Sequence, residues 1–173
     1  MKKLLAFFVS FLLVFTVQAQ TTYEVLADSA HNNEKMLKGM ITKEELSNEP
    51  LFTWYGESQR IYSNPDPALV NALEKNKDKI YFIVFGGTWC EDTHYVLPKF
   101  FKAQEVSGFP ESRITLFAVD RHKKTTGTIA QAMGVTNVPT IIVMENGKEK
   151  GRVVEYGKTG KWDKELAEII DGK

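Results

Sequence analysis

The chain has 173 residues, which is enough for one ordinary globular domain and too few for two of generous size. Hydrophobic residues make up 43% and charged residues 25%, so we expect a packed core. The 22 basic and 22 acidic residues cancel, which leaves no overall charge to attract nucleic acid or an anionic membrane. The chain has a single cysteine, so any disulfide has to be made with another molecule.

The first residues have the three-part layout of a secretory signal peptide. Lys2 and Lys3 precede an apolar run over residues 4–17, and residues 17–19 place small side chains where signal peptidase cleaves. The alternative is a membrane anchor, but an apolar run of about 14 residues is short of the ~20 that span a bilayer. We therefore predict a signal peptide over residues 1–19, export to the periplasm or the extracellular space, and no membrane anchor after cleavage.

Residues 20–65 are predicted to form a leader and a helical, aromatic extension. Residues 21–33 are polar and have no clear period, which favours a mobile leader. Residues 42–45 have the pattern of a capping box that opens a short helix. A short strand is expected near residues 60–62. Residues 48–64 are rich in aromatic side chains, which are expected to pack on the main domain or to face a partner: Phe52, Trp54, Tyr55 and Tyr62.

The rest of the chain alternates helix and strand patterns. The apolar run over residues 80–85 predicts a strand covered on both faces. The expected elements are, in chain order, a helix ending near residue 78, strand 80–85, helix 90–106, strand 114–119, helix 126–133, strand 140–145, a hairpin turn at Asn146-Gly147, strand 152–155 and helix 161–170. This alternation predicts an α/β fold with a parallel core and an antiparallel edge.

The segment after the 80–85 strand carries the cysteine. From Thr88 it reads Thr-Trp-Cys-Glu-Asp-Thr, which resembles the active-site loop of the thioredoxin family, Trp-Cys-x-x-Cys. The further matches, in order, are Pro98, Asp120, the triplet Val138-Pro139-Thr140 and the terminal hairpin. The resemblance covers roughly residues 66–171. It implies that residues 66–173 adopt a thioredoxin fold, with a central mixed sheet of four to five strands and helices on both faces.

Cys90 is predicted to be the reactive group, because a thiolate is a nucleophile and the free N–H groups of a helix N-terminus favour it. The resemblance implies that Pro139 follows a cis peptide bond and lies against Cys90. It also implies that the backbone of Val138 pairs with an extended substrate. Thr88 and Trp89 complete the predicted substrate-binding and catalytic residues. The alternatives are a buried, unreactive thiol and an ordinary proline at the start of a strand.

Two departures separate this chain from dithiol members of the family. Thr93 stands where the second cysteine would be, and its hydroxyl is expected to stabilise the thiolate. Val84 and Leu116 stand where the family has a buried aspartate and its accompanying lysine. A buried carboxylate is costly without a task or a partner. The joint loss of these groups therefore indicates chemistry with a single cysteine.

Charged neighbours are expected to modulate Cys90. Glu91 and Asp92 oppose the thiolate, or simply suit a helix N-terminus. His94 is four residues after Cys90 and shares its helix face, unless it merely faces solvent. The basic run over residues 121–124, which includes His122, lies at the same end of the sheet. It is expected to attract an anionic substrate or to be a solvated surface.

These residues are compatible with three functions. The first is a thiol-disulfide oxidoreductase in which Cys90 forms mixed disulfides with a client protein or a glutathione-like thiol. The second is a redox-inactive thioredoxin-fold module that binds extended peptides. The third is metal carriage by Cys90 and His94 with an acidic neighbour or His122, but two ligands at i and i+4 fall short of the four of a closed site. We predict the first, with no metal, no cofactor and no nucleic acid partner.

Overall fold

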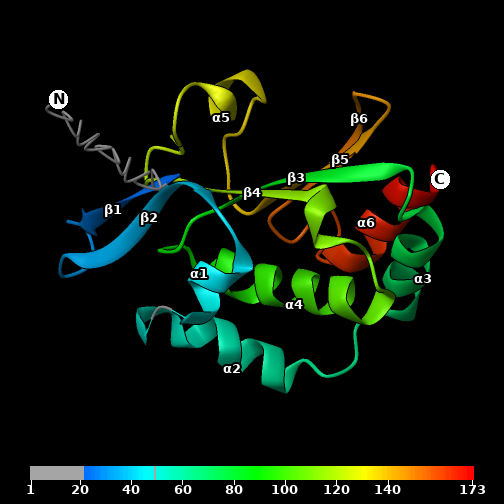
Figure 1. Ribbon diagram of the computed structural model, residues 1–173, viewed down its shortest axis with the longest axis horizontal. Coiled ribbons are helices and arrows are strands. Elements are labelled where there is room, and N and C mark those ends of the chain that lie inside the picture. Colours follow the sequence, from blue (N-terminus) through cyan, green and yellow to red (C-terminus); the bar gives the residue numbers. More distant parts are fainter. Residues whose placement is uncertain (1–21, 49) are drawn as a thin grey trace, which may run out of the picture.

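A computed structural model gives the structure of residues 22–48 and 50–173 (Figure 1). The predicted signal peptide, residues 1–19, lies outside the described residues. The elements are β1 (Tyr23–Asp28), β2 (Glu34–Ile41), α1 (Lys43–Asn48), η1 (Pro50–Phe52), α2 (Thr53–Ile61), α3 (Pro67–Asn76), β3 (Ile80–Gly86), α4 (Glu91–Ser107), η2 (Glu111–Arg113), β4 (Ile114–Ala118), α5 (Ile129–Ala132), β5 (Thr140–Glu145), β6 (Lys148–Val154) and α6 (Trp162–Asp171). No helix in these ranges is long and apolar enough to cross a membrane.

A mixed sheet of six strands forms the centre of the described structure, in the order β1-β2-β4-β3-β5-β6. β3 is parallel to β4 and antiparallel to β5. Phe82 and Val84 of β3 belong to the apolar cluster beneath the main helix layer, whereas Phe85 belongs to a cluster on the opposite face. Because both faces are covered there, a nearly continuous apolar run suits this strand.

Helices α2, α3, α4 and α6 lie together on one face of the sheet, and α5 lies on the other (Figure 1). The long helix α4 packs against both α2 and α3. Its buried side chains recur at helical spacing and include the four that the sequence predicts: Val96, Leu97, Phe100 and Phe101. The predicted α/β architecture with helices on both faces is confirmed.

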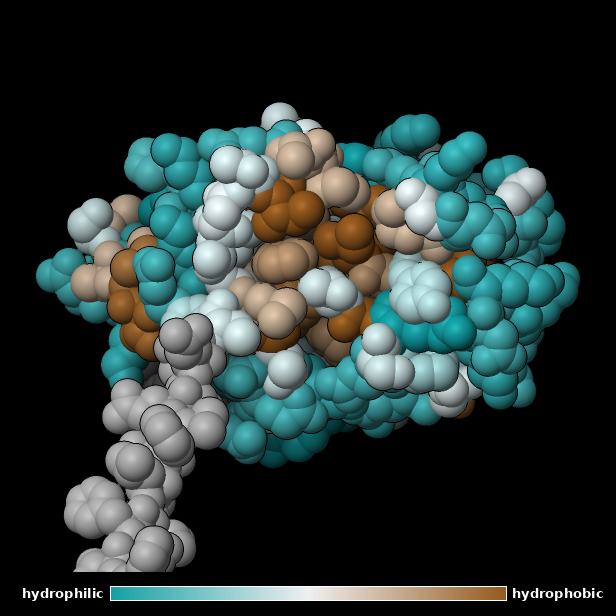
Figure 2. Space-filling view, turned by 45° about the horizontal axis from the view of Figure 1, so that its top comes forward, coloured by the Kyte–Doolittle hydropathy of each residue, from teal (hydrophilic) through white to brown (hydrophobic). Residues whose placement is uncertain are grey.

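The face of the sheet that carries α5 is only partly covered. A small apolar cluster that includes Val119 and Ile142 fills the space near α5, and Trp89 and Cys90 pack against it. Around this cluster apolar side chains remain partly exposed: Ile83, Phe117, Met133 and Met144. Figure 2 shows apolar side chains gathered in the middle of this face of the molecule. The cysteine loop therefore borders an apolar surface.

The prediction of a mobile leader over residues 21–33 is wrong for the residues that the structure describes. β1 and β2 form a hairpin, in which Asn32 and Asn33 adopt the positive φ angles that asparagine tolerates in turns. β2 also pairs antiparallel with β4 and buries Leu37 and Ile41. The polar sequence of β1 gave no strand pattern, because β1 is an edge strand with few buried side chains. The sheet consequently has six strands instead of four to five.

The strand expected near residues 60–62 is also wrong. Residues 53–61 form α2, which packs on α4 through the buried Tyr55 ring against Phe101. The place beside β4 that an additional strand could occupy is taken by β2. Two smaller corrections concern bounds, because α5 spans only 129–132 and β6 already begins at residue 148.

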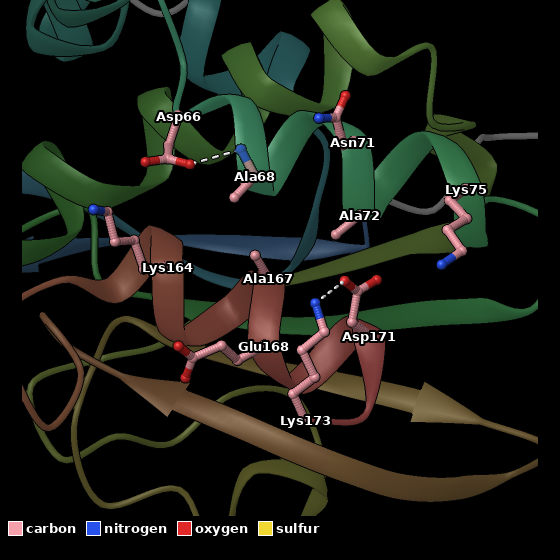
Figure 3. Close-up of a pocket in the computed structure, with 10 residues that line it drawn as sticks. All are labelled: Asp66, Ala68, Asn71, Ala72, Lys75, Lys164, Ala167, Glu168, Asp171 and Lys173. Carbon is pink, nitrogen blue, oxygen red and sulfur yellow. Dashed lines mark hydrogen bonds and ion pairs between the residues drawn. The ribbon is translucent and has the colours of Figure 1, made fainter.

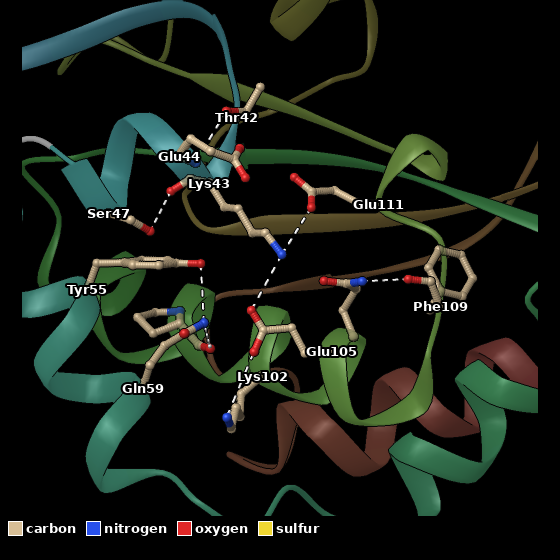
Figure 4. Close-up of polar contacts among 12 residues, drawn as sticks. Thr42, Lys43, Glu44, Ser47, Tyr55, Gln59, Lys102, Glu105, Phe109 and Glu111 are labelled. Atoms are coloured by element: carbon tan, nitrogen blue, oxygen red, sulfur yellow. Dashed lines mark hydrogen bonds and ion pairs between the residues drawn. The ribbon is translucent and has the colours of Figure 1, made fainter.

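The predicted capping box is confirmed, and an ion pair of the helix that it opens links the extension to α4 (Figure 4). The Thr42 N–H donates to Glu45 at 2.7 Å, and the Glu44 N–H donates to the Thr42 hydroxyl at 3.2 Å. Lys43 in the first turn of α1 then bridges Glu105 of α4 and Glu111, at 3.4 and 3.0 Å. The extension is thus part of the same packed body as the strands and helices that follow it.

Candidate active site

Cys90 lies where β3 passes into α4. It is the N-cap residue, with φ −105° and ψ 120°, and its side chain is half-buried. Its thiol donates to the carbonyl oxygen of Val138, with Sγ at 3.3 Å. The bond between Val138 and Pro139 is cis, which the resemblance implied. The predicted cysteine and the cis-proline segment, 48 residues apart in sequence, are therefore in contact.

The two glycines before this loop lie in close contact with side chains of the loop and of α4. A Cβ on Gly87 would lie 2.8 Å from Cε2 of Trp89, and one on Gly86 would lie 3.1 Å from Cγ2 of Thr93. Thr93 is buried, and its hydroxyl oxygen accepts from the Gly87 N–H at 3.1 Å. Within the described structure no side-chain hydrogen bond joins Thr93 to Cys90. The visible role of Thr93 is therefore to fix the turn that precedes the cysteine.

Thr88 connects the loop to β2. Its side chain is buried, and its hydroxyl oxygen accepts from the Leu37 N–H at 3.1 Å. Its carbonyl oxygen accepts from Nε2 of His94 at 2.8 Å. Both groups of Thr88 thus hold the loop in place.

His94 stacks on Trp54, which the sequence did not link to the site. The ring centroids are 4.1 Å apart and the planes differ by 18°. Because a carbonyl only accepts, Nε2 carries the proton in the bond to Thr88. Burial lowers the pKa of His94, so the imidazole is held in its neutral form. His94 is neither a solvent-facing side chain nor a cation beside Cys90.

The two acidic residues after Cys90 differ in their surroundings. Glu91 is exposed, whereas Asp92 is half-buried and bonded to the hydroxyl of Tyr156, which follows β6. Burial, followed by the hydrogen bond to Asp92 and its charge, raises the pKa of Tyr156 to about 12. The phenol therefore stays protonated and donates to Asp92. The ring of Tyr156 also packs against Tyr95, with 5.3 Å between centroids.

Trp89 lies beneath two cations of the basic run. Its indole N–H donates to the Val119 carbonyl at 2.9 Å, which fixes the ring. The guanidinium carbon of Arg121 is 4.8 Å from the ring centroid and Nζ of Lys123 is 5.4 Å from it. His122 is exposed on the same loop. Of the basic run, Arg121 and Lys123 are therefore the residues placed beside the cysteine loop.

Several site residues were missed because they come from distant segments. Asp28 forms a two-bond pair with Arg121, Trp54 covers His94, and Tyr156 meets Asp92. Asp28 and Trp54 belong to the segment predicted to be leader and extension. Only Trp54 had a signal in the sequence, the aromatic stretch, and that stretch was also compatible with a surface that binds a partner.

A groove lies away from the cysteine site. It has a volume of about 580 Å³ and lies between α3 and α6 (Figure 3). Its lining includes Asp66, Asn71, Lys75, Lys164 and Asp171, and none of its residues belongs to the cysteine loop or the cis-proline segment. Among the residues that the structure describes, no group of three or more His, Cys, Asp or Glu side chains is arranged to hold a metal ion.

The chain resembles known proteins in sequence and in fold. The sequence profile of the thioredoxin family matches residues 66–171. Thioredoxin from Mycoplasma genitalium is 33% identical over 78 residues, which cover 45% of this chain and 71% of that protein. A Pseudomonas aeruginosa crystal structure of unknown function superposes with a TM-score of 0.54 at 19% identity, over 77% of this chain and 93% of that one. An HIV epitope scaffold gives a TM-score of 0.47 at 18% identity, over 77% and 99%.

The match lies on the elements that build the site. Residues 66–171 contain β3, the cysteine loop, α4 and the cis-proline segment, whereas the hairpin β1–β2 and helices α1 and α2 lie outside it. The predicted thioredoxin fold is confirmed. Because the family profile covers more than half of the chain and the strands and helices agree with it, this protein belongs to the thioredoxin family.

Proposed function

We propose that this protein is an exported thiol-disulfide oxidoreductase that works with one cysteine. The Cys90 thiolate attacks one sulfur of a disulfide, a new S–S bond joins Cys90 to that sulfur, and the other sulfur leaves as a thiolate. A second, external thiolate then attacks the mixed disulfide and releases Cys90. The two steps reduce one substrate disulfide or exchange its partner, at the expense of a low-molecular-weight or protein thiol.

The observation that carries this proposal is the position of Sγ. It lies at the N-terminus of the 17-residue helix α4, where free N–H groups favour an anion, and it is only half-buried. It also touches Val138, whose own N–H has no partner among the described residues. This N–H is the backbone group with which an extended substrate would pair while its sulfur meets Cys90.

The environment of Thr93 supports resolution by an external thiol. The side chain at this position is buried and bonded to the Gly87 N–H, and Val84 and Leu116 are part of the apolar core. The chain has no second thiol to attack the mixed disulfide. Release then depends on the concentration of the resolving thiol.

The test is to trap the intermediate. Purified protein is mixed with a glutathionylated peptide, quenched with acid and an alkylating agent, and weighed by mass spectrometry. We expect a disulfide adduct on Cys90 that disappears when reduced glutathione is added, and no adduct with Cys90→Ser. In Thr93→Cys the adduct is expected to be short-lived without added thiol. Absence of any adduct on the unmodified protein contradicts the proposal.

Export has its own test. The protein is recovered from fractionated cells that express the full chain, and its N-terminus is determined by mass spectrometry. We expect the mature chain to start at Gln20 in the exported fraction. A full-length chain retained in the cytoplasm would contradict this part of the proposal.

A second function, peptide binding without redox chemistry, is favoured by one observation. The cysteine loop borders the apolar surface around Ile83 and Phe117, which suits apolar segments of a client. The trapping experiment separates the two functions. Client binding that is unchanged in Cys90→Ala, with no disulfide adduct on the unmodified protein, would favour the binding module.

A further inference from the structure

Two cationic side chains lie over the indole of Trp89, the residue before Cys90. Arg121 and Lys123 both lie over this ring, at 4.8 and 5.4 Å from its centroid, and the ring is fixed by its bond to Val119. Two like charges at this separation repel each other, so other contacts must hold them near the same ring. Lys123 Nζ donates to the Arg121 carbonyl at 3.2 Å, which brings the two residues together.

Asp28 at the end of β1 fixes the guanidinium of Arg121. Its two carboxylate oxygens accept from Nε and Nη2 of Arg121 at 2.6 and 2.7 Å, and Asp28 is only 2% exposed. This is a planar, two-bond pairing that defines the orientation of the guanidinium. The hydrogen bond to Asp28 is the main cause that raises the pKa of Arg121, and the charge of Cys90 contributes in the same direction. Arg121 is thus held in a defined place within the electrostatic reach of the thiol.

The charges around this loop do not cancel. Asp28 compensates Arg121, and Asp120 pairs with Lys38 at 3.3 Å. Lys123 and Lys124 have no ion-pair partner in the part of the chain that the structure describes. Of the two acidic side chains after Cys90, Asp92 is bonded to Tyr156 and Glu91 is exposed, and within the described residues neither pairs with a cation of this loop. The loop therefore presents a net positive surface beside the cysteine.

We propose that Arg121 and Lys123, seated on Trp89, form a subsite that selects disulfides carrying a carboxylate next to the scissile sulfur. The inference rests on the proposed oxidoreductase function and adds the substrate class. The chemistry is unchanged: the Cys90–S bond forms, the substrate S–S bond breaks, and the leaving thiolate keeps the electron pair. The cations act on the substrate's carboxylate and on the leaving thiolate, both of which are negative. Asp28 is a positioning residue that acts through Arg121.

The test compares three disulfide probes of different charge in single-turnover reactions with Cys90. The probes are anionic 5,5′-dithiobis(2-nitrobenzoate), neutral 4,4′-dithiodipyridine and cationic cystamine. The readout is the ratio of the anionic to the neutral rate constant for the unmodified protein and for Arg121→Gln and Lys123→Gln. Lys124→Gln is the matched control, because it removes an exposed cation of the same loop that does not lie over Trp89.

We expect this ratio to fall about two- to fivefold for each cation removed from Trp89, and to fall as salt is added. Lys124→Gln is expected to leave the ratio nearly unchanged, and cystamine to react more slowly than the neutral probe. Asp28→Asn is expected to lower the ratio through loss of the orientation of Arg121. Circular dichroism spectra check that each variant is folded.

Two outcomes overturn the subsite. In one, Arg121→Gln and Lys123→Gln change all three rates by the same factor. In the other, the ratio falls as much in Lys124→Gln as in the two test variants. Either result leaves the reactivity of Cys90 standing. A thiol that fails to react even with the neutral probe contradicts the proposed function instead, so the two failures are distinguishable.

Discussion

The side chains around Cys90 act on it in opposite directions. The N-terminus of α4 and the cations over Trp89 favour a negative sulfur, whereas Glu91, Asp92 and the carbonyl of Val138 oppose it. Tyr156 moderates one of these opposing groups by donating to Asp92. The reactivity of the cysteine therefore depends on groups from β1, the β4–α5 loop and the segment after β6, as well as on its own helix.

Removing the phenol from Asp92 is predicted to slow Cys90. In Tyr156→Phe the Asp92 carboxylate loses the hydrogen bond from the phenol. Its negative charge is then less compensated and disfavours the thiolate of Cys90. We expect alkylation by iodoacetamide near neutral pH to slow about twofold. Tyr95→Phe is the control, because it removes a hydroxyl from the neighbouring ring. An alkylation rate that is unchanged or faster in Tyr156→Phe would show that the phenol does not act on the thiol.

His94 makes the stability of the fold depend on pH. Its pKa is lowered by burial, so the unfolded chain, with an ordinary pKa of about 6.5, binds the proton more readily. The stabilisation is present above about pH 6.5 and is lost as the pH falls towards the lower pKa of the folded state. We expect the urea midpoint to drop between about pH 7.5 and 5.5, and the drop to shrink in His94→Gln. An equal drop in both proteins would assign it to other groups.

At the scale of elements, a buried hydrogen bond joins β2 and the cysteine loop. The Leu37 N–H donates to the Thr88 hydroxyl across 51 residues of sequence. Because an unpaired buried N–H is costly, Thr88→Val is expected to lower the free energy of unfolding by about 1–3 kcal/mol. Thr88→Ser keeps the oxygen and serves as the control in denaturant unfolding. If the valine and serine variants are equally stable, this hydrogen bond does not stabilise the fold.

The elements that the sequence predicts well have a local signal. β3, α4 and β5 show apolar runs, helical spacing or a β-rich composition, and their ends agree with the structure to within a residue or two. β1 lacks such a signal because few of its side chains are buried, and β2 lacks it because its buried residues do not alternate regularly and its pairing with β4 is distant in sequence. Within the site, Cys90 and Pro139 follow from a motif. The contacts of Asp28, Trp54 and Tyr156 depend on the folded chain.

Considered as a whole molecule, the protein is larger than the part that matches the thioredoxin family. The apolar cluster beneath the helix layer includes five large side chains that precede the match: Leu37, Ile41, Leu46, Phe52 and Tyr55. Burial of one such side chain contributes about 1.5–3 kcal/mol, and a whole domain is stable by only about 5–15 kcal/mol. The hairpin and the first helices are therefore necessary to the core.

A fragment of residues 66–173 is accordingly predicted not to fold by itself. Without β2, one edge of β4 is open, and without α2 the apolar side of α4 near Phe101 is exposed. We expect a weak or absent cooperative transition on heating, followed by circular dichroism. Residues 20–173 measured in parallel provide the reference. A fragment that unfolds cooperatively at a temperature near that of the reference would contradict the prediction.

The stacking of Trp54 on His94 has an optical consequence. A protonated imidazole in contact with an indole quenches its fluorescence, so Trp54 emission is expected to report the ionisation of this histidine. Replacing the two other tryptophans, Trp89 and Trp162, by phenylalanine would isolate that signal. Because His94 also holds the carbonyl of Thr88, the same emission would follow movement of the cysteine loop when a substrate binds. The protein thus carries an intrinsic fluorophore at the back of its reactive loop.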